Sequence, residues 1–361
     1  MNASGVWFWT VPGRLILSGA QHKKEVVVGL DSGSTGIKGA LFCPRERRII
    51  EVLPYVRHHN DYDHAAAEML RGLAERYFVL SVNVTGATGK VLAAAWKSLN
   101  VIAEVTAHAR GIRYYNSDVA AVLDAGGAEI KFFKIDGDGR TWDFAMNPEC
   151  AAGSGSFLDQ QAKRLMMSVD DASLPEKHFP SVGLDAVIRN ETVPISGRCS
   201  VFAKSDMIHQ QQKGVPDSAI VGGLHESLVN NIKATVIQHR LKGFEGILSF
   251  QGGLSMNGAM VRCLAAQLGL PDEKLYVHKH GYAAGAVGAA LAGVGVHFDV
   301  DDLDIPVRKT RGESFYEPLT DDYASQKPDV EAVLYPLKAG EKLEAYLGID
   351  VGSVSTNVVL I

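Results

Sequence analysis

The chain of 361 residues is poor in cysteine, has no long apolar run and carries no excess of positive charge. Four cysteines are too few for a disulfide framework, which indicates a reducing, cytoplasmic compartment. No run of about 18 uncharged apolar residues occurs, so we expect no membrane-spanning helix. The formal net charge is −5, and the lack of a basic stripe excludes a general nucleic-acid binder. The 46% hydrophobic content is enough for one substantial α/β core.

Two of the cysteines stand at loop-to-helix junctions. Cys150 is followed by Ala-Ala-Gly-Ser-Gly, and Cys199 has a similar setting. A thiolate at a helix start is stabilised by the helix dipole and suits a soft metal, whereas Cys43 and Cys263 fit small buried hydrophobes. The chain lacks the CxxC pairs of a zinc site and the four-cysteine run of a ferredoxin. Two thiolates cannot complete a four-iron cluster, but a homodimer with both pairs at its two-fold axis would supply four.

A P-loop is also missing, although a glycine-rich loop is present. The apolar strand 26–30 leads into Asp31-Ser-Gly-Ser-Thr-Gly and then into a second strand, where a P-loop would continue as a helix. Such a hairpin turn offers N–H and hydroxyl groups to phosphate oxygens from Gly33, Ser34 and Thr35. Asp31 at the strand end is placed to hold a magnesium-bound water.

Two further glycine-rich segments each follow an apolar strand. A strand ending in Asp124 precedes Gly126 and Gly127 and leads to a second strand. Later, an apolar strand runs into Gly252 and Gly253 before a helix, which would let backbone pack flat against a base or a ribose. Three such junctions, two of them with an aspartate, predict a nucleotide held between two lobes.

With these motifs the chain resembles the ATPase activators of 2-hydroxyacyl-CoA dehydratases. They belong to the BadF/BadG/BcrA/BcrD ATPase family, which includes the ATPase subunits of benzoyl-CoA reductase. The resemblance implies an actin-like ATPase (ribonuclease H-like) α/β fold with two lobes around a nucleotide cleft. The matching segments are 31–38, 85–89, 104–111, 124–131, 147–158, 195–205, 252–257 and 285–291.

The resemblance further implies a homodimer that carries one 4Fe-4S cluster, with Cys150 and Cys199 of each subunit as ligands. ATP and Mg²⁺ would drive transfer of one low-potential electron to a 2-hydroxyacyl-CoA dehydratase or a related reductase. A ferredoxin or a flavodoxin would supply that electron. The resemblance also assigns roles to single positions of this chain. Asp31 and Asp124 would orient magnesium or water, and Gly252 and Gly253 would line the adenosine side. The phosphate-binding residues would be Gly33, Ser34, Thr35, Lys38, Gly126 and Gly127.

The chain departs from the family pattern at one residue and over one segment. The family has Gly-Gly-Gln-Asp after the second aspartate, and this chain has Ala128 where the glutamine stands. If that glutamine positions the hydrolytic water, the replacement affects hydrolysis rather than binding. An insertion near residues 170–191 predicts a surface loop and a short helix. His108 is expected to be structural, because no second metal-type residue has an evident place beside it.

The end of the sequence repeats the first hairpin. The segment 347–352, Leu-Gly-Ile-Asp-Val-Gly, resembles residues 29–33 and the residues on either side of them, and Asn357 stands in place of Lys38. This repetition predicts that the sequence is the front part of a larger tandem protein. A chance likeness of a C-terminal hairpin is the alternative. The expected organisation is a disordered leader over 1–24, an ATPase domain over 25–298 with lobes 25–115 plus 281–298 and 116–280, a connector over 299–345, and the start of a second, truncated domain over 346–361.

Two rival functions remain open at this stage. A sugar or amino-sugar kinase of the same superfold would need a general-base aspartate and would leave Cys150 and Cys199 idle. A nucleotide-dependent scaffold without turnover is compatible with Ala128. Iron content separates the activator from both rivals, and turnover separates the kinase from the scaffold.

Overall fold

The computed structural model describes residues 23–147, 154–196, 200–307, 346–351 and 356–360. Cys150 and Cys199 lie outside these ranges. The chain divides into two compact units, Met1–Arg308 and Lys309–Ile361. The first unit holds two sheets with helices packed on them, and the second holds one hairpin.

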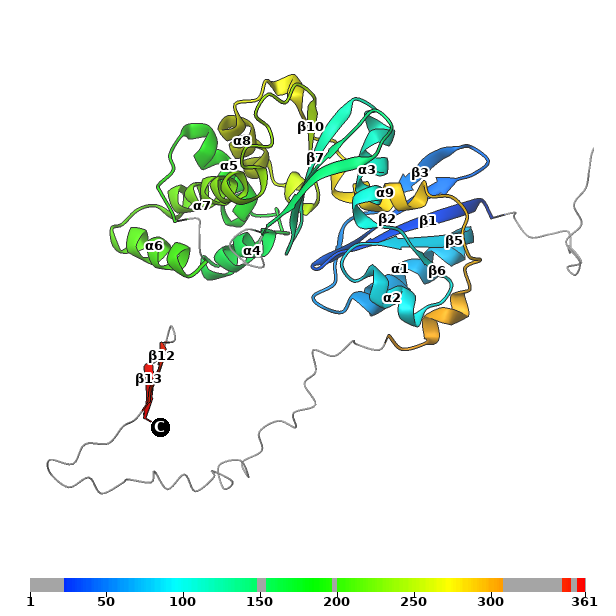
Figure 1. Cartoon of the computed structure of the whole chain (residues 1–361), viewed down its shortest axis with the longest axis horizontal. Coiled ribbons are helices and arrows are strands. Elements are labelled where there is room, and N and C mark those ends of the chain that lie inside the picture. The colour runs from blue at the N-terminus through cyan, green and yellow to red at the C-terminus, as the bar shows by residue number, and fades with distance from the viewer. Residues whose placement is uncertain (1–22, 148–153, 197–199, 308–345, 352–355, 361) are drawn as a thin grey trace, which may run out of the picture. The chain divides into compact units, whose positions relative to one another are not determined.

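The first sheet is built around a strand that is buried at every position but the first, and it has the order β3-β2-β1-β5-β6. Helices α1 and α2 cover one face, and α9 covers the other (Figure 1). A strand that is covered on both faces consists of a continuous run of apolar residues, and residues 26–30 form such a run. The elements are β1 (Glu25–Ser32), β2 (Gly36–Cys43), β3 (Arg48–Val52), β4 (Val56–Arg57), β5 (Phe78–Thr85), β6 (Leu99–Val101), α1 (Tyr62–Arg76) and α2 (Gly89–Ala95).

The second sheet repeats this plan with the order β11-β10-β7-β8-β9. Its larger core packs Phe157, Phe179 and Phe250 among helices α4, α5, α7 and α8, and α5, α7 and α8 lie side by side (Figure 1). The elements are β7 (Val119–Ala125), β8 (Ile130–Ile135), β9 (Thr141–Met146), β10 (Ile247–Gln251), β11 (Leu275–Tyr276), α4 (Gly155–Arg164), α5 (Phe179–Arg189), α6 (Ser200–Gln212), α7 (Asp217–Ile232) and α8 (Gly258–Leu268).

Short helical turns join these elements. They are the 3-10 helices η2 (Pro175–Lys177), η4 (Gly253–Met256), η5 (Asp272–Lys274), η6 (Gly281–Ala283) and η7 (Val300–Asp304), and the π-helix η3 (Lys233–Ile237) that extends α7. Among the described helices, none combines the length and the apolar character that a membrane crossing requires.

Two helices, α3 (Glu104–Tyr115) and α9 (Ala284–Ala290), connect the sheets. Helix α9 packs on the first sheet and α3 on the second, and the two helices pack against each other. Their backbones approach so closely that a Cβ on Gly111 would lie 1.8 Å from the Ala284 carbonyl oxygen, and one on Gly288 would lie 1.7 Å from that of Ala107. Glycine is therefore required at this crossing, which places the two sheets side by side around one junction.

The packed unit extends beyond residue 298, where the connector was expected to begin. Leu303 and Val307 are buried in the core of the first sheet, and the Trp96 indole Nε1 donates to the Ile305 carbonyl oxygen at 2.9 Å. Three acidic residues of this segment, Asp299, Asp302 and Asp304, serve as acceptors. Asp302, for example, accepts from the Ser98 backbone N–H at 2.6 Å. Residues 299–307 are thus part of the folded unit.

The second unit contains a hairpin of β12 (Leu347–Val351) and β13 (Thr356–Leu360). Asp350 lies opposite Asn357 in its register, as Asp31 lies opposite Lys38 in the β1–β2 hairpin. The backbone pairing therefore repeats the one that the sequence similarity predicts for this segment.

Candidate functional site

The loops of two hairpins, β1–β2 and β7–β8, meet at one small cavity of about 40 Å³. In each hairpin the aspartate at the end of the first strand lies opposite a lysine: Asp31 opposite Lys38 and Asp124 opposite Lys131. Strand β10 brings a third loop to the same place. All the described residues that the sequence predicted for the site line this cavity: Asp31, Gly33, Ser34, Thr35, Lys38, Asp124, Gly126, Gly127, Gly252 and Gly253.

In the first hairpin the charges are paired locally. Lys38 Nζ lies 3.3 Å from Asp31 Oδ2, and both side chains are buried. Burial disfavours the ammonium, but Asp31, Tyr55 and Asp124 together outweigh that cost, so the pKa of Lys38 is raised. The loop closes through a hydrogen bond from Gly33 N to the Gly36 carbonyl oxygen at 3.1 Å. The His58 ring also contacts this loop, because its Nε2 lies 3.0 Å from the Gly33 carbonyl oxygen.

In the second hairpin the lysine pairs elsewhere. Lys131 Nζ lies 2.7 Å from Glu104 Oε1 and 2.5 Å from Glu129 Oε2. Burial disfavours its ammonium, and the two glutamates outweigh that cost, so the pKa of Lys131 is raised. Asp124 Oδ1 remains buried and without a hydrogen-bond partner among the described residues. A buried carboxylate oxygen in that state is costly unless a ligand completes it.

His108 lies at the centre of this acidic group. Its Nδ1 is 3.5 Å from Asp124 Oδ1 and 2.8 Å from Gln251 Nε2, and its Nε2 is 3.9 Å from Glu104 Oε1. The sequence predicted a structural role for His108 because no second metal-type residue had an evident place beside it, and that reason is wrong. Helix α3 places Glu104 one turn before His108, and β7 brings Asp124 to the same point. The i, i+4 spacing of Glu104 and His108 is the signal that the sequence carried.

Glycine is needed where the loops approach each other. A Cβ on Gly127 would lie 2.2 Å from Thr35 Cγ2, so the two hairpin loops are in contact across the cleft. Gly252 has φ +83°, and a Cβ there would lie 2.6 Å from the Ala125 carbonyl oxygen. A side chain at either position would push the loops apart or strain the backbone.

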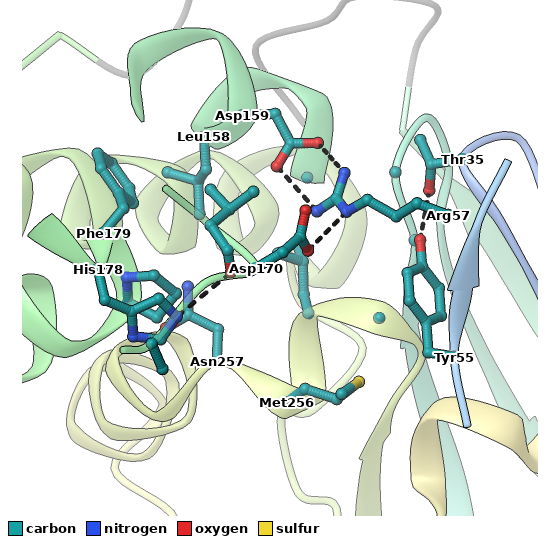
Figure 2. Close-up of a pocket in the computed structure, with 18 residues that line it drawn as sticks. Thr35, Tyr55, Arg57, Leu158, Asp159, Asp170, His178, Phe179, Met256 and Asn257 are labelled. Atoms are coloured by element: carbon teal, nitrogen blue, oxygen red, sulfur yellow. Dashed lines mark hydrogen bonds and ion pairs between the residues drawn. The ribbon is translucent and has the colours of Figure 1, made fainter. Parts of the chain in front are cut away.

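A larger cavity of about 340 Å³ opens on the other side of this contact. It shares Thr35, Gly126, Gly127 and Gly253 with the small one, so the two cavities are neighbours on either side of these loop residues. Apolar side chains of Leu158, Phe179, Leu254 and Met256 form much of its lining, and Asn257 and His178 add polar groups (Figure 2). A volume of this size is typical of a pocket for a nucleoside-sized ligand.

The inserted segment contributes to this cavity. The sequence predicted a surface loop with a short helix, and α5 is that short helix. However, Phe179 at its start is fully buried, and Asp170, His178 and Pro180 line the cavity wall. The insertion is therefore part of the site as well as of the surface.

An arginine joins the two sides of the larger cavity. Arg57 on β4 reaches Asp159 on α4, with Nη1 2.8 Å from Oδ2, and its Nε donates to Asp170 Oδ1 at 2.8 Å (Figure 2). Partial burial disfavours the guanidinium charge, but hydrogen bonds and ion pairs with Asp159 and Asp170 outweigh it and raise the pKa of Arg57. Beside it, the Tyr55 and Thr35 hydroxyls are 3.0 Å apart.

The first turn of α4 is bound to the second hairpin loop. Gly155 N donates to the Gly126 carbonyl oxygen at 3.0 Å, and Ser156 donates to that of Gly127 from both N (2.8 Å) and Oγ (2.7 Å). Helix α4 follows the segment that contains Cys150, and α6 begins at the residue after Cys199. The other two cysteines, Cys43 and Cys263, are buried as predicted, and burial raises the pKa of the Cys263 thiol to about 12.

Known proteins share this architecture. The activator of 2-hydroxyisocaproyl-CoA dehydratase from Clostridium difficile with bound ADPNP matches with a TM-score of 0.63 and 27% identity, over 77% of this chain and 95% of that one. Component A of (R)-2-hydroxyglutaryl-CoA dehydratase from Acidaminococcus fermentans matches with a TM-score of 0.62 and 25% identity, over 74% of this chain and 97% of that one. Two helix-covered sheets around a cleft with these neighbours define an actin-like ATPase fold.

Sequence comparison narrows the class to a family. Residues 28–293 match the BadF/BadG/BcrA/BcrD ATPase family, and the chain belongs to it. A 2-hydroxyisocaproyl-CoA dehydratase activator of Clostridioides difficile is 32% identical over 190 residues, which are 53% of this chain and 65% of that relative. The chain thus matches somewhat less than two thirds of that relative's length.

Proposed function

We propose that this protein is an ATP-dependent activator that passes a low-potential electron to a 2-hydroxyacyl-CoA dehydratase or a related iron–sulfur reductase. The observation that carries the proposal is the meeting of two Asp/Gly hairpin loops and a third glycine loop at one cleft, in a chain of this ATPase family. The relatives named above act on dehydratases.

The shape of the cleft supports ATP as its ligand. The small cavity between the loops is lined by the Gly33–Thr35 loop, and the backbone N–H and hydroxyl groups of Ser34 and Thr35 suit phosphate oxygens. The larger cavity suits the adenosine, with Gly253 at the boundary between the two. Because the smaller volume of about 40 Å³ is too small for a triphosphate, we expect the contact between Thr35 and Gly127 to open when ATP enters.

The carboxylates at the small cavity fit Mg²⁺. This ion favours oxygen ligands and usually combines one or two carboxylates with phosphate oxygens and waters. Asp31 and Asp124 face the cavity, and the unpartnered Asp124 Oδ1 is available for an ion or its water. We propose that these two residues orient the ion or its waters.

The hydrogen bonds between α4 and the second loop support a mechanical coupling. Any shift of Gly126 and Gly127 on nucleotide binding moves the first turn of α4, to which they are bound. The segment just before that turn contains Cys150. We propose that Cys150 and Cys199 of two subunits hold one 4Fe-4S cluster, whose reduction potential such a shift would tune through exposure and hydrogen bonding.

The proposed assembly is a homodimer that takes its electron from a ferredoxin or flavodoxin. The β12–β13 hairpin supports a tandem organisation, since its register matches that of β1–β2. We propose that it is the first phosphate hairpin of a second ATPase domain. Asn357 in the place of Lys38 would leave that copy without the ammonium that pairs with the aspartate.

The test is the iron and acid-labile sulfide content of protein purified without oxygen, together with its ATP turnover. About two irons per subunit and broad visible absorbance are expected for one bridging cluster per dimer. Cys150→Ala and Cys199→Ala should each lose the cluster and keep ATP affinity within about threefold, with Cys43→Ala as the matched control that keeps both. Colourless protein after anaerobic reconstitution would contradict the proposal. Turnover that depends on a sugar would then indicate a kinase.

A further inference from the structure

Glu104 is held in a fixed position by a buried lysine. Only 8% of the Lys131 side chain is exposed, and a buried ammonium needs carboxylate partners close by. Glu104 on α3 supplies one of them although it lies on a different element from Lys131 on β8. Both described contacts of the Glu104 carboxylate, with Lys131 and with His108, are made by Oε1, so neither uses Oε2.

Glu104 also faces the place where the terminal phosphate is expected. It lines the small cavity together with the Gly33–Thr35 loop and the Gly126–Gly127 loop. Its side chain is 28% exposed, which gives a proton a route to solvent. The residue that stands where the family has glutamine, Ala128, carries only a methyl group, which cannot orient a water molecule.

We propose that Glu104, positioned by Lys131, is the catalytic residue that orients the attacking water in this chain. The inference rests on the proposed ATPase function and names the residue that performs the hydrolytic step. Phosphoryl transfer depends chiefly on positioning and charge, and one group that orients the water is a recurrent part of such sites. Among the described residues lining the cavity, Glu104 is the one carboxylate that comes from outside both hairpins, and a lysine of the second hairpin fixes it.

The step balances as a simple hydrolysis. The water oxygen forms a bond to the terminal phosphorus, and the bond from that phosphorus to the bridging oxygen breaks. ADP leaves with the bridging oxygen. The proton of the water passes to the Glu104 carboxylate and from there to solvent, and inorganic phosphate remains.

The experiment compares hydrolysis with binding in the full chain. Single-turnover ATP hydrolysis and the affinity for a non-hydrolysable ATP analogue are measured for wild type and Glu104→Gln. We expect the rate to fall about 100-fold while the affinity stays within about threefold, as for loss of an interaction made in the transition state. Glu68→Gln on the exposed side of α1 is the matched control and should change neither quantity.

Two further variants sharpen the test. Glu104→Asp keeps the charge that Lys131 needs and should fold even if the glutamine variant does not; we expect a loss of about tenfold in rate. Adding Ala128→Gln to Glu104→Gln should restore part of the rate, because it returns a hydrogen-bonding side chain to the loop. A Glu104→Gln protein that hydrolyses ATP at more than about a tenth of the wild-type rate would overturn the inference. Wild-type protein that binds the analogue but never hydrolyses ATP would instead contradict the proposed function itself.

Discussion

The β1–β2 and β7–β8 hairpins carry the same residue types at the same register but use them differently. In both, an aspartate at the end of the first strand lies opposite a lysine on the second. In β1–β2 the two side chains form a local ion pair at 3.3 Å. In β7–β8 the lysine pairs with Glu104 and Glu129, and Asp124 Oδ1 has no hydrogen-bond partner in the part of the chain that the structure describes. One backbone pattern thus produces two electrostatic environments.

This difference separates two tasks within one site. A lysine neutralised by its own aspartate leaves the first loop free to bind phosphate through backbone and hydroxyl groups. An aspartate oxygen without a hydrogen-bond partner among the described residues suits an ion or its water, and a glutamate fixed by a lysine suits the attacking water. The source of the asymmetry is α3, because its Glu104 competes with Asp124 for Lys131. Among the described residues, no carboxylate from outside the first hairpin lies within ion-pair distance of Lys38.

The largest expected effects come from removing each aspartate in turn. Asp124→Asn should lower the rate of ATP hydrolysis by about 100-fold or more, because it removes a cavity-facing carboxylate whose Oδ1 has no hydrogen-bond partner among the described residues. Its free energy of unfolding should change by less than about 1 kcal/mol. Asp31→Asn should in contrast lower that free energy by about 3–5 kcal/mol, because it leaves the buried Lys38 without its partner.

Urea unfolding and phosphate release measure the two quantities on the same samples. Asp118→Asn, an exposed residue before β7, is the matched control for an aspartate change on the second sheet. If Asp31→Asn and Asp124→Asn destabilised the fold equally, the two hairpins would not differ in the way that the geometry indicates.

A smaller effect is expected from adding one methyl group to each glycine of the second loop. Gly127→Ala places a Cβ 2.2 Å from Thr35 Cγ2, so the two hairpin loops must separate. Gly126→Ala meets only the Glu129 carbonyl oxygen at 3.2 Å. We expect ATP affinity to fall about tenfold for Gly127→Ala and less than about threefold for Gly126→Ala, measured with a fluorescent ATP analogue.

Adding Thr35→Ser to Gly127→Ala removes Thr35 Cγ2, the atom closest to the new Cβ, and should restore part of the ATP affinity that Gly127→Ala loses. Equal losses in the two glycine variants would show that the contact between the hairpin loops does not limit nucleotide binding.

The residues at the two loops were predictable because their pattern is local. Aspartate, glycine and a following strand mark each hairpin within about ten residues, and a shared register brings the predicted positions to one cavity. The alternation of strands and helices likewise predicted the α/β layers. In each case the information lies within one or two neighbouring elements.

The network around Lys131 was not predictable in that way. Its partner Glu104 lies on α3, and their contact depends on the tight crossing of α3 with α9 and on the packing of α3 against the second sheet. Residues 299–307 show the same limit: their acidic and proline residues favour a connector locally, while Leu303 and Val307 find a core that only the fold supplies. The roles of Cys150 and Cys199 stay predictions.

The smallest expected effect concerns the link between the two sides of the cleft. Arg57 comes from the β-sheet of the first hairpin, and Asp159 lies on α4, which is bound to the second loop. Because both side chains are partly exposed, a double-mutant cycle of Arg57→Ala and Asp159→Ala should give a coupling of about 1 kcal/mol in the free energy of unfolding. If ATP opens the cleft, the same cycle with a saturating non-hydrolysable analogue should give a smaller coupling. An unchanged coupling would mean that Arg57 and Asp159 move together when the nucleotide binds, so that the loops part without separating the two sides at this link.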